Sequence, residues 1–337
     1  MKILSAVGGF VLRLSPKGLS SSVYLQRRKT MSTVMSWVSR VEDSIRREIA
    51  TFLLLTFALA WGCQIAAISL GVDFNQLDSS PPIVWVMLIG TAWAPGLAAL
   101  ATRLMYYRNL RGMGWRGVQP RYLLLGAGLT FLFIALGYIA AWLLSPGSFA
   151  PFQVLDEATA MLGRGWAADG IIVPIYLGLN VLMLLLPIGF FALGEEIGWS
   201  GLLAPQLARM TSFGSTALIT GIIWALYHFP LMLFGDYTQG VPLWYGLLIN
   251  STVLVASGFM PIWLRLKSGS MWPAVLTHTC WNIFMFYLFE PITRTTPLTL
   301  YLVGEKGAAT AVVVIVSALL FWRLGRSLMD RPGDERN

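Results

Sequence analysis

The chain has 337 residues, of which 56% are apolar and only 12% are charged. A soluble globular domain carries about 25% charged residues, so this composition excludes an ordinary soluble enzyme and indicates an integral membrane protein. The net charge of +8 does not indicate a nucleic-acid partner, because most basic residues flank apolar segments, where they act as topology signals.

The first 45 residues differ from the rest of the chain. They are basic, and the apolar run near their start is interrupted by Arg13 and followed by Ser-rich sequence, which is atypical of a signal peptide. Met31 and Met35 are alternative start sites. We expect residues 1–45 to be a disordered extension, or one created by a misassigned start codon. A transmembrane domain should then occupy residues 46–326, and residues 327–337 should form a short polar tail.

The apolar stretches predict an all-α fold, a polytopic membrane helix bundle of about eight transmembrane helices. A helix needs about 20 apolar residues to cross a bilayer, and the chain is long enough for about eight. The predicted spans are residues 49–71, 83–105, 122–144, 171–194, 215–235, 243–264, 270–289 and 308–325. Three prolines within them are expected mainly to pack helices: Pro187, Pro230 and Pro261.

The connections between these spans alternate in charge. Basic residues precede the first span and occupy every second connection after it, whereas the other connections carry mainly acidic residues. The basic set is Arg40, Arg46, Arg47, Arg103, Arg108, Arg111, Arg116, Arg121, Arg209, Arg265, Lys267, Arg323 and Arg326; the acidic set is Asp73, Asp78, Asp156, Glu157, Asp169 and Asp236. The positive-inside rule therefore predicts that both termini are cytoplasmic.

Two adjacent carboxylates lie inside one of the most apolar stretches of the chain. They are Glu195 and Glu196, and the two histidines of the chain, His228 and His278, also lie inside predicted spans. Adjacent helical residues point about 100° apart, so only one of the carboxylates can face a given neighbour. Any one of these groups alone could be an interfacial charge or a packing residue. Together they indicate a functional site, because ionisable groups are costly at bilayer depth.

Helical spacing places other polar residues in pairs. Trp224 and His228 lie four residues apart, as do His278 and Asn282, so each pair shares a helix face. A carboxylate beside an imidazole can take a proton from water and deliver hydroxide to a carbonyl, while a second imidazole and an amide can hold the oxyanion that forms. Cys280 is about 200° round the helix from His278, and is therefore predicted to be a packing residue.

The same side chains include the ligand types of a catalytic zinc site. If zinc is present, Glu195, His228 and His278 would bind it. The chain has no HExxH sequence, which disfavours a thermolysin-like enzyme. Asn282 suits an oxyanion better than a zinc ion. Metal-free chemistry is the preferred prediction, and zinc remains the alternative.

Taken in order, the three polar segments resemble the motifs of the CAAX prenyl protease and bacteriocin-processing (CPBP, or Abi) family of intramembrane endopeptidases. Those motifs read Glu-Glu-x-x-x-Arg, aromatic-x-x-x-His and His-x-x-x-Asn/Asp, on separate membrane helices. The chain has Glu195-Glu196, Trp224-x-x-x-His228 and His278-x-x-x-Asn282. The resemblance covers about residues 85–290, with its motif core in residues 190–285.

This resemblance implies a role for each motif residue. Glu195 and His228 would activate the attacking water. His278 and Asn282 would stabilise the oxyanion. Glu196 would support the site by charge or hydrogen bonding. The implied substrate is a membrane-embedded or prenylated peptide or protein, in the plasma membrane of a bacterial cell.

One position departs from the family motif. Ser200 stands where the motif has arginine, four residues after Glu196. An arginine there could pair with Glu196 across one helical turn, whereas a serine cannot neutralise a buried carboxylate. We therefore expect Glu196 to be protonated, exposed at the interface, or paired with a distant cation such as Arg209.

Three functions remain open at this stage. The first is an intramembrane endopeptidase. The second is a catalytically degenerate relative that acts as a membrane immunity factor or scaffold, a hypothesis motivated by Ser200. The third is a proton-coupled transporter, because intramembrane Glu and His residues can form proton relays, although the chain lacks an evident internal repeat.

Overall fold

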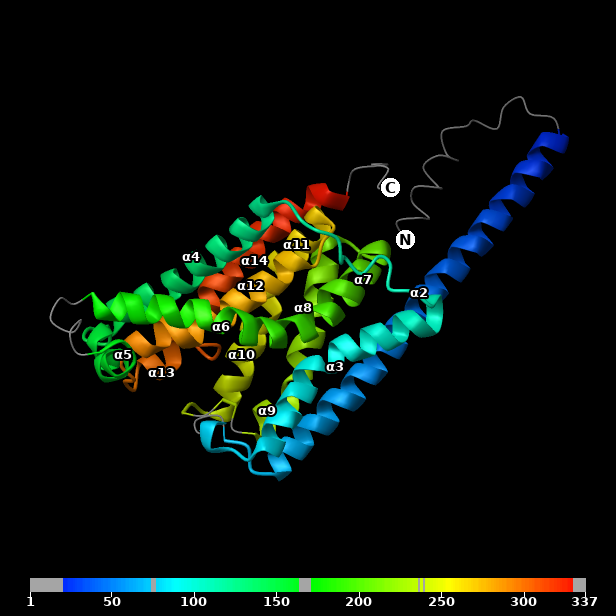
Figure 1. The fold of residues 1–337 in the computed structure, drawn as a ribbon. Coiled ribbons are helices and arrows are strands. Elements are labelled where there is room, and N and C mark those ends of the chain that lie inside the picture. The colour runs from blue at the N-terminus through cyan, green and yellow to red at the C-terminus, as the bar shows by residue number, and fades with distance from the viewer. Residues whose placement is uncertain (1–20, 74–76, 164–170, 236, 239, 330–337) are drawn as a thin grey trace.

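The computed structural model describes residues 21–73, 77–163, 171–235, 237–238 and 240–329. Throughout these ranges the regular structure is helical, and the β-structure amounts to one isolated bridge between Phe149 and Thr293. Long helices lie side by side in a single bundle (Figure 1). The predicted all-α polytopic architecture is confirmed.

The helices follow the predicted spans closely. The main helices are α2 (Ser21–Ser69), α3 (Pro82–Tyr107), α4 (Pro120–Leu144), α6 (Ile172–Glu196), α8 (Phe213–Tyr227), α10 (Leu243–Ser257), α12 (Trp272–Asn282) and α14 (Ala308–Met329). Shorter helices are α5 (Leu155–Leu162), α7 (Ala204–Met210), α9 (Phe229–Phe234), α11 (Phe259–Ser268) and α13 (Thr299–Leu302). Two segments are π-helical, η4 (Ile197–Leu203) and η5 (Ile283–Phe289). Three are 3-10 turns: η1 (Leu77–Ser79), η2 (Pro151–Val154) and η6 (Glu290–Ile292).

Six helices in the described part of the chain are long and apolar enough to cross a membrane. They cover Met35–Ser69, Pro82–Tyr107, Pro120–Leu144, Ile172–Met210, Leu243–Ser268 and Ala308–Leu328. The other two predicted spans are broken into shorter pieces. One is divided into α8 and α9 at His228, just before Pro230, which lacks the N–H that a continuous helix needs. The other passes from α12 into η5. The predicted count of eight is therefore not confirmed, although a multi-pass membrane protein is.

The helix α2 begins well before the first predicted span. It is continuous from Ser21, where a disordered extension was expected, to Ser69. Residues 1–20 of that extension and residues 330–337 of the predicted polar tail lie outside the described residues.

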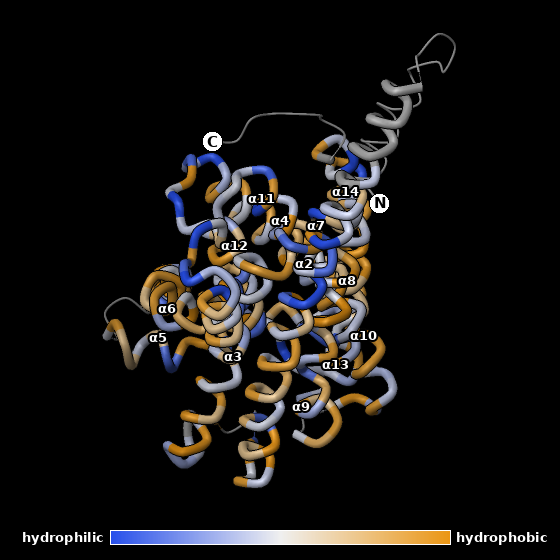
Figure 2. The backbone as a smooth tube through the Cα atoms, turned by 90° about the vertical axis from the view of Figure 1, so that its right-hand side faces the viewer, coloured by the Kyte–Doolittle hydropathy of each residue, from blue (hydrophilic) through white to orange (hydrophobic). Residues whose placement is uncertain are grey.

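The outer surface of the bundle is apolar, as a lipid environment requires. Leu54, Leu143 and Leu186 are 74%, 76% and 85% exposed. Hydrophobic residues run along the helices, and hydrophilic segments gather near the end of the bundle where α11 and α14 finish (Figure 2). An aqueous protein rarely exposes so much apolar surface, so this distribution agrees with a bundle embedded in a bilayer.

Helix α6 packs between α3 and α12 and carries the two carboxylates at its end. The approach to α3 is close because both helices have glycine at the crossing. A Cβ atom on Gly194 would lie 2.7 Å from the carbonyl oxygen of Ala92, and one on Gly96 would lie 2.5 Å from the carbonyl oxygen of Gly194. Small residues at such crossings let membrane helices pack backbone to backbone. This contact sets the position of Glu195, the next residue along α6.

The end of α8 is tied to the two N-terminal helices by hydrogen bonds. The amide of Gln64 on α2 donates to the carbonyl oxygen of Tyr227 at 2.9 Å. The hydroxyl of Tyr227 donates to the carbonyl oxygen of Thr91 on α3 at 2.6 Å. Because Tyr227 is fully buried and precedes His228, these bonds position that histidine.

Candidate functional site

The Glu195 carboxylate is held by two indoles. The Nε1 atoms of Trp199 and Trp224 both donate to its Oε2 atom, at 3.2 Å and 2.7 Å respectively. Trp199 lies four residues further along the chain, in η4, whereas Trp224 comes from α8. The side chain of Glu195 is partly exposed. Its Oε1 atom accepts no hydrogen bond from any described residue, so it is available to a water molecule or a substrate.

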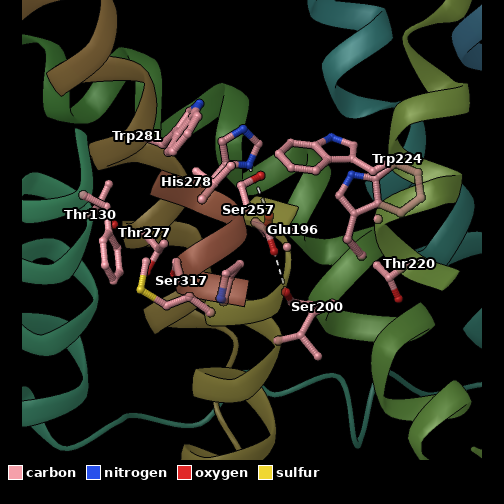
Figure 3. Close-up of a pocket in the computed structure, with 18 residues that line it drawn as sticks. Thr130, Glu196, Ser200, Thr220, Trp224, Ser257, Thr277, His278, Trp281 and Ser317 are labelled. Carbon is pink, nitrogen blue, oxygen red and sulfur yellow. Dashed lines mark hydrogen bonds and ion pairs between the residues drawn. The ribbon is translucent and has the colours of Figure 1, made fainter. Parts of the chain in front are cut away.

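The Glu196 carboxylate points in a different direction and contacts α12. It is only 5% exposed. Its Oε2 atom accepts a hydrogen bond from the Ser200 hydroxyl, and its Oε1 atom lies 3.1 Å from Nδ1 of His278 (Figure 3). The two carboxylates thus point at different helices, as their 100° separation requires.

These contacts correct two expectations for Glu196. It is buried rather than exposed at the interface. Arg209 does not pair with it, because the guanidinium donates instead to Oε1 of Gln206 at 2.9 Å. The partners of Glu196 are the imidazole of His278 and the hydroxyl of Ser200. A serine in the arginine position therefore still reaches the carboxylate, as a hydrogen-bond donor rather than as a cation.

His228 lies at the break between α8 and α9. Its Nδ1 atom is 2.9 Å from the carbonyl oxygen of Trp224. A carbonyl can only accept, so Nδ1 carries the hydrogen, and in the neutral ring Nε2 then carries the lone pair. The ring contacts Tyr227 and Tyr237, with centroids 4.7 Å and 5.9 Å away. His228 is thus held in the tautomer that leaves Nε2 free to accept a proton.

The third motif lies on α12. His278 is buried, and its ring packs against Trp224 with a centroid separation of 5.4 Å. Asn282 is the last residue of α12 and is partly exposed. Its amide makes no hydrogen bond with the part of the chain that the structure describes. It therefore has donors to offer a bound group.

The helices that carry the first and third motifs, α6 and α12, change to π-helix directly after their polar residues. The segment η4 follows Glu196, and η5 follows Asn282. π-helical turns are rare and occur frequently at functional sites, because the wider turn redirects the side chains around it. Two of them beside the same carboxylate–imidazole pair set this region apart from the rest of the bundle.

A small cavity is lined by Glu196, His278 and Trp224 (Figure 3). Its volume is about 50 Å³, and Ser200 and Ser257 add hydroxyl groups to its wall. A water molecule needs a cavity of at least about 10–15 Å³ with several polar partners. The cavity is therefore large enough and polar enough to hold water beside the His278–Glu196 pair.

The residues suggested for zinc do not form a metal-binding group in the structure. Within the described residues, no three His, Cys, Asp or Glu side chains are close enough to hold a metal ion. Glu195 is bound by two indoles, while His278 faces Glu196. The arrangement does not fit a metal site made of Glu195, His228 and His278.

A third carboxylate near the site was not predicted from the sequence. Glu305, in the loop before α14, accepts hydrogen bonds from the hydroxyl of Tyr237 at 2.7 Å and from the indole of Trp281 at 3.2 Å. Burial, together with the negative charge of Glu305, raises the pKa of Tyr237 well above its ordinary value. The sequence signal that could have indicated it is the charged pair Glu305-Lys306, which lies between two apolar segments.

Tyr237 also contacts the ring of His228. Glu305 is therefore linked to the candidate site through one aromatic side chain. It lines a larger open cavity, of about 730 Å³, together with Tyr237, Asn250 and Lys306. Through Tyr237, this cavity lies one side chain away from His228.

The fold and these contacts define a class of protein: a polytopic membrane helix bundle with a buried glutamate–histidine site at the meeting point of three helices. Comparison with known proteins identifies a matching family. Residues 177–284 match the model of the type II CAAX prenyl endopeptidase Rce1-like family, a range that includes all the motif residues. This match supports assignment of the chain to the CPBP family.

A curated relative supports this assignment. The chain is 30% identical over 154 residues to CAAX prenyl protease 2 of Methanococcus maripaludis, an alignment that covers 43% of this chain and 53% of that protein. The chain thus spans about half the length of the relative that it matches.

Proposed function

We propose that this protein is an intramembrane endopeptidase that hydrolyses a peptide bond in a membrane-associated, lipid-modified protein or peptide. One observation carries the proposal: Trp224 contacts three residues of the candidate site. Its indole donates to Glu195, its carbonyl oxygen binds Nδ1 of His228, and its ring packs against His278. A single residue thus gathers the carboxylate and both imidazoles.

The first chemical step is activation of water. The free Oε1 of Glu195 and the lone pair on Nε2 of His228 are the two basic positions on the side of the site that is partly exposed. One of them takes a proton from water as the water oxygen forms a bond with the carbonyl carbon of the substrate. General-base catalysis of this kind contributes typically 10²–10⁴-fold to the rate.

The second step is stabilisation of the oxyanion. In the doubly protonated imidazole of His278, Nδ1 donates to Glu196 and Nε2 donates to the oxyanion, with the amide of Asn282 as a second donor. The bond between the carbonyl carbon and the amide nitrogen then breaks. The proton taken from water passes to the leaving nitrogen, so that no net charge is created.

The substrate class is proposed from the family match. The matching relative is described as a CAAX prenyl protease, and a prenylated C-terminal peptide is therefore the first substrate to test. The partly exposed surroundings of Glu195 and the adjacent open cavity are compatible with a peptide entering from the membrane surface.

The departure at Ser200 gives less support to a non-catalytic scaffold than the sequence alone suggested. That hypothesis depended on an uncompensated charge on Glu196. In the structure the carboxylate has an imidazole and a hydroxyl as partners. Loss of the motif arginine therefore leaves the support that Glu196 gives to His278 in place.

The direct test is peptide cleavage by purified protein in nanodiscs, with Glu195→Gln as the variant. We expect the wild-type protein to cleave a fluorogenic farnesylated CAAX peptide, and the variant to be at least about 100-fold slower. Glu157→Gln is the matched control, because Glu157 is an exposed acid on α5, far along the chain from the motifs.

Unmodified peptide and a bacteriocin-leader peptide serve as alternative substrates in the same assay. Equal rates for the wild type and Glu195→Gln, with both proteins folded, would refute the assigned mechanism. If no peptide is cleaved, proton flux into liposomes that depends on Glu195 would instead support a transporter.

A further inference from the structure

A third cavity, separate from the candidate site, is lined by three arginines. Its volume is about 800 Å³, and it lies where the loop between α3 and α4 meets the loop between α11 and α12. We call it the arginine pocket and define it by Arg111, Arg116 and Arg265, with Gly114 and Gly269 in its wall. Nothing in the proposed peptidase chemistry uses these residues.

Arg265 is the central residue of the pocket, because it is a buried cation without an acid. The residue is only 6% exposed. Its Nε atom donates to the carbonyl oxygen of Ser200 at 2.8 Å, and Nη2 donates to that of Gly112 at 3.1 Å. Among the described residues, ion pairs join Arg103 to Glu48 and His278 to Glu196, and none includes Arg265. A buried charge left without a counter-charge is costly.

The two loops are shaped around the guanidinium groups. Gly114 has φ +87° and Gly269 has φ +72°, conformations that favour glycine. A Cβ atom at Gly114 would lie 2.9 Å from Cζ of Arg265, and one at Gly269 would overlap the guanidinium of Arg116. Glycine at both positions therefore allows the backbone to close on two arginines at once.

Backbone carbonyl oxygens accept hydrogen bonds from only some of the N–H groups of each guanidinium. Arg116 donates through Nε to Gly269 and through Nη2 to Ser268, both at 3.2 Å. Each guanidinium has five N–H groups, so Arg116 and Arg265 each keep donors that no described residue accepts. Arg111 is exposed at the rim, and its guanidinium has no acceptor in the described part of the chain. The pocket thus combines three positive charges with unused donors.

The surroundings of the pocket are those of a membrane surface. Trp115 and Trp272 flank it, are 37% and 36% exposed, and are joined by a hydrogen bond from the Trp272 indole to the Trp115 carbonyl oxygen at 3.2 Å. Tryptophan is enriched at the level of lipid headgroups. The loops that form the pocket also directly connect helices that match predicted spans.

We propose that the arginine pocket binds the phosphate of an acidic membrane phospholipid. A phosphodiester accepts from guanidinium groups in the forked geometry that arginine favours. The bound anion neutralises the buried charge of Arg265. Because Arg265 also holds the carbonyl of Ser200, whose hydroxyl binds Glu196, the lipid stabilises the segment that carries the candidate site.

The experiment measures lipid binding by native mass spectrometry and by titration in nanodiscs. Full-length protein is placed in phosphatidylcholine nanodiscs with increasing phosphatidylglycerol. The test variant is Arg111→Gln/Arg116→Gln, which changes exposed residues and spares Arg265. The matched control is Arg121→Gln/Arg323→Gln, which removes two exposed arginines outside the pocket.

We expect phosphatidylglycerol to bind the wild type and the control with affinities that agree within about threefold, and to bind the pocket variant about 30-fold more weakly. That figure corresponds to about 1 kcal/mol for each arginine near an anionic surface. Inorganic phosphate, added to phosphatidylcholine nanodiscs, is expected not to raise the thermal unfolding midpoint.

Three results would overturn the proposal. Equal losses in the pocket variant and the control would show general surface electrostatics rather than a site. Unchanged binding in the pocket variant would show that Arg111 and Arg116 do not bind the lipid. Stabilisation of the wild type by inorganic phosphate as strong as that by phosphatidylglycerol would assign the pocket to a free anion. None of these results depends on peptidase activity.

Discussion

The hydrogen bond from Ser200 to Glu196 allows a sharp test of how this chain manages without the motif arginine. Ser200 is 1% exposed and Glu196 is 5% exposed, so the bond is shielded from bulk water. Hydrogen bonds to charged groups contribute about 1.5–3 kcal/mol to stability. Ser200→Ala should therefore lower the free energy of unfolding by about that amount, which is roughly a 12- to 140-fold change in the folding equilibrium.

A double-mutant cycle isolates this interaction. In a Glu196→Gln background the same serine meets a neutral amide, for which a hydrogen bond contributes about 0.5–1.5 kcal/mol. The expected coupling energy between the two positions is therefore about 1–1.5 kcal/mol. The assay is reversible unfolding of the purified protein in mixed micelles, followed by tryptophan fluorescence as the denaturing detergent is increased.

Ser317→Ala provides the control. Ser317 is buried and lines the same cavity, but its hydroxyl has no carboxylate partner in the described part of the chain. It should show a smaller loss and no coupling to Glu196→Gln. If Ser200→Ala costs the same in both backgrounds, the loss comes from packing alone. The interpretation of Ser200 as the substitute for the motif arginine would then be wrong.

Three further predictions follow from the site and the fold. Trp224→Phe removes the indole donor to Glu195 but keeps the backbone carbonyl; the rate of peptide cleavage should fall about 10- to 100-fold with the protein still folded, and an unchanged rate would contradict the role of the indole. In the folded protein the pKa of Tyr237 is raised above its ordinary value of 10.0. The stability that depends on its proton is therefore present below about pH 10 and is lost as the pH rises above it. Between pH 9 and pH 11 the free energy of unfolding should fall less in Tyr237→Phe than in the wild type. Gly194→Ala should cost about 1–3 kcal/mol of stability because its methyl group would press on α3, whereas Gly178→Ala, in the same helix with no atom within 4 Å, should be tolerated.

The sequence alone was sufficient for six of the eight predicted spans. Spans predicted from apolar run length lie close to the helices of the structure, because a helix that crosses lipid must be continuous and apolar over its own length. The candidate residues were also visible, since Glu195, His228 and His278 are ionisable groups in apolar segments. These properties are local, and each can be read within about one helix.

The sequence was less informative where a helix is interrupted. The spans that became α8 with α9, and α12 with η5, read as continuous apolar segments. In the structure His228 lies at a break before Pro230, and α12 changes to π-helix after Asn282. Proline inside a membrane helix can either kink it or end it, and a π-helical turn has no reliable local pattern.

Only the tertiary structure decided which groups meet. His278 is 82 positions from Glu196, and its choice of Glu196 over Glu195 depends on the rotation of α6 relative to α12. Helix packing also decides that Trp224 contacts the rings of both histidines. It likewise decides that Arg265 donates to the carbonyl oxygen of Ser200 from another helix. Such pairings depend on how closely the helices cross. Glycines such as Gly194 allow a close crossing, which brings side chains on neighbouring helices within hydrogen-bonding distance. The sequence therefore determined which residues are available for chemistry, and helix packing determined their partners.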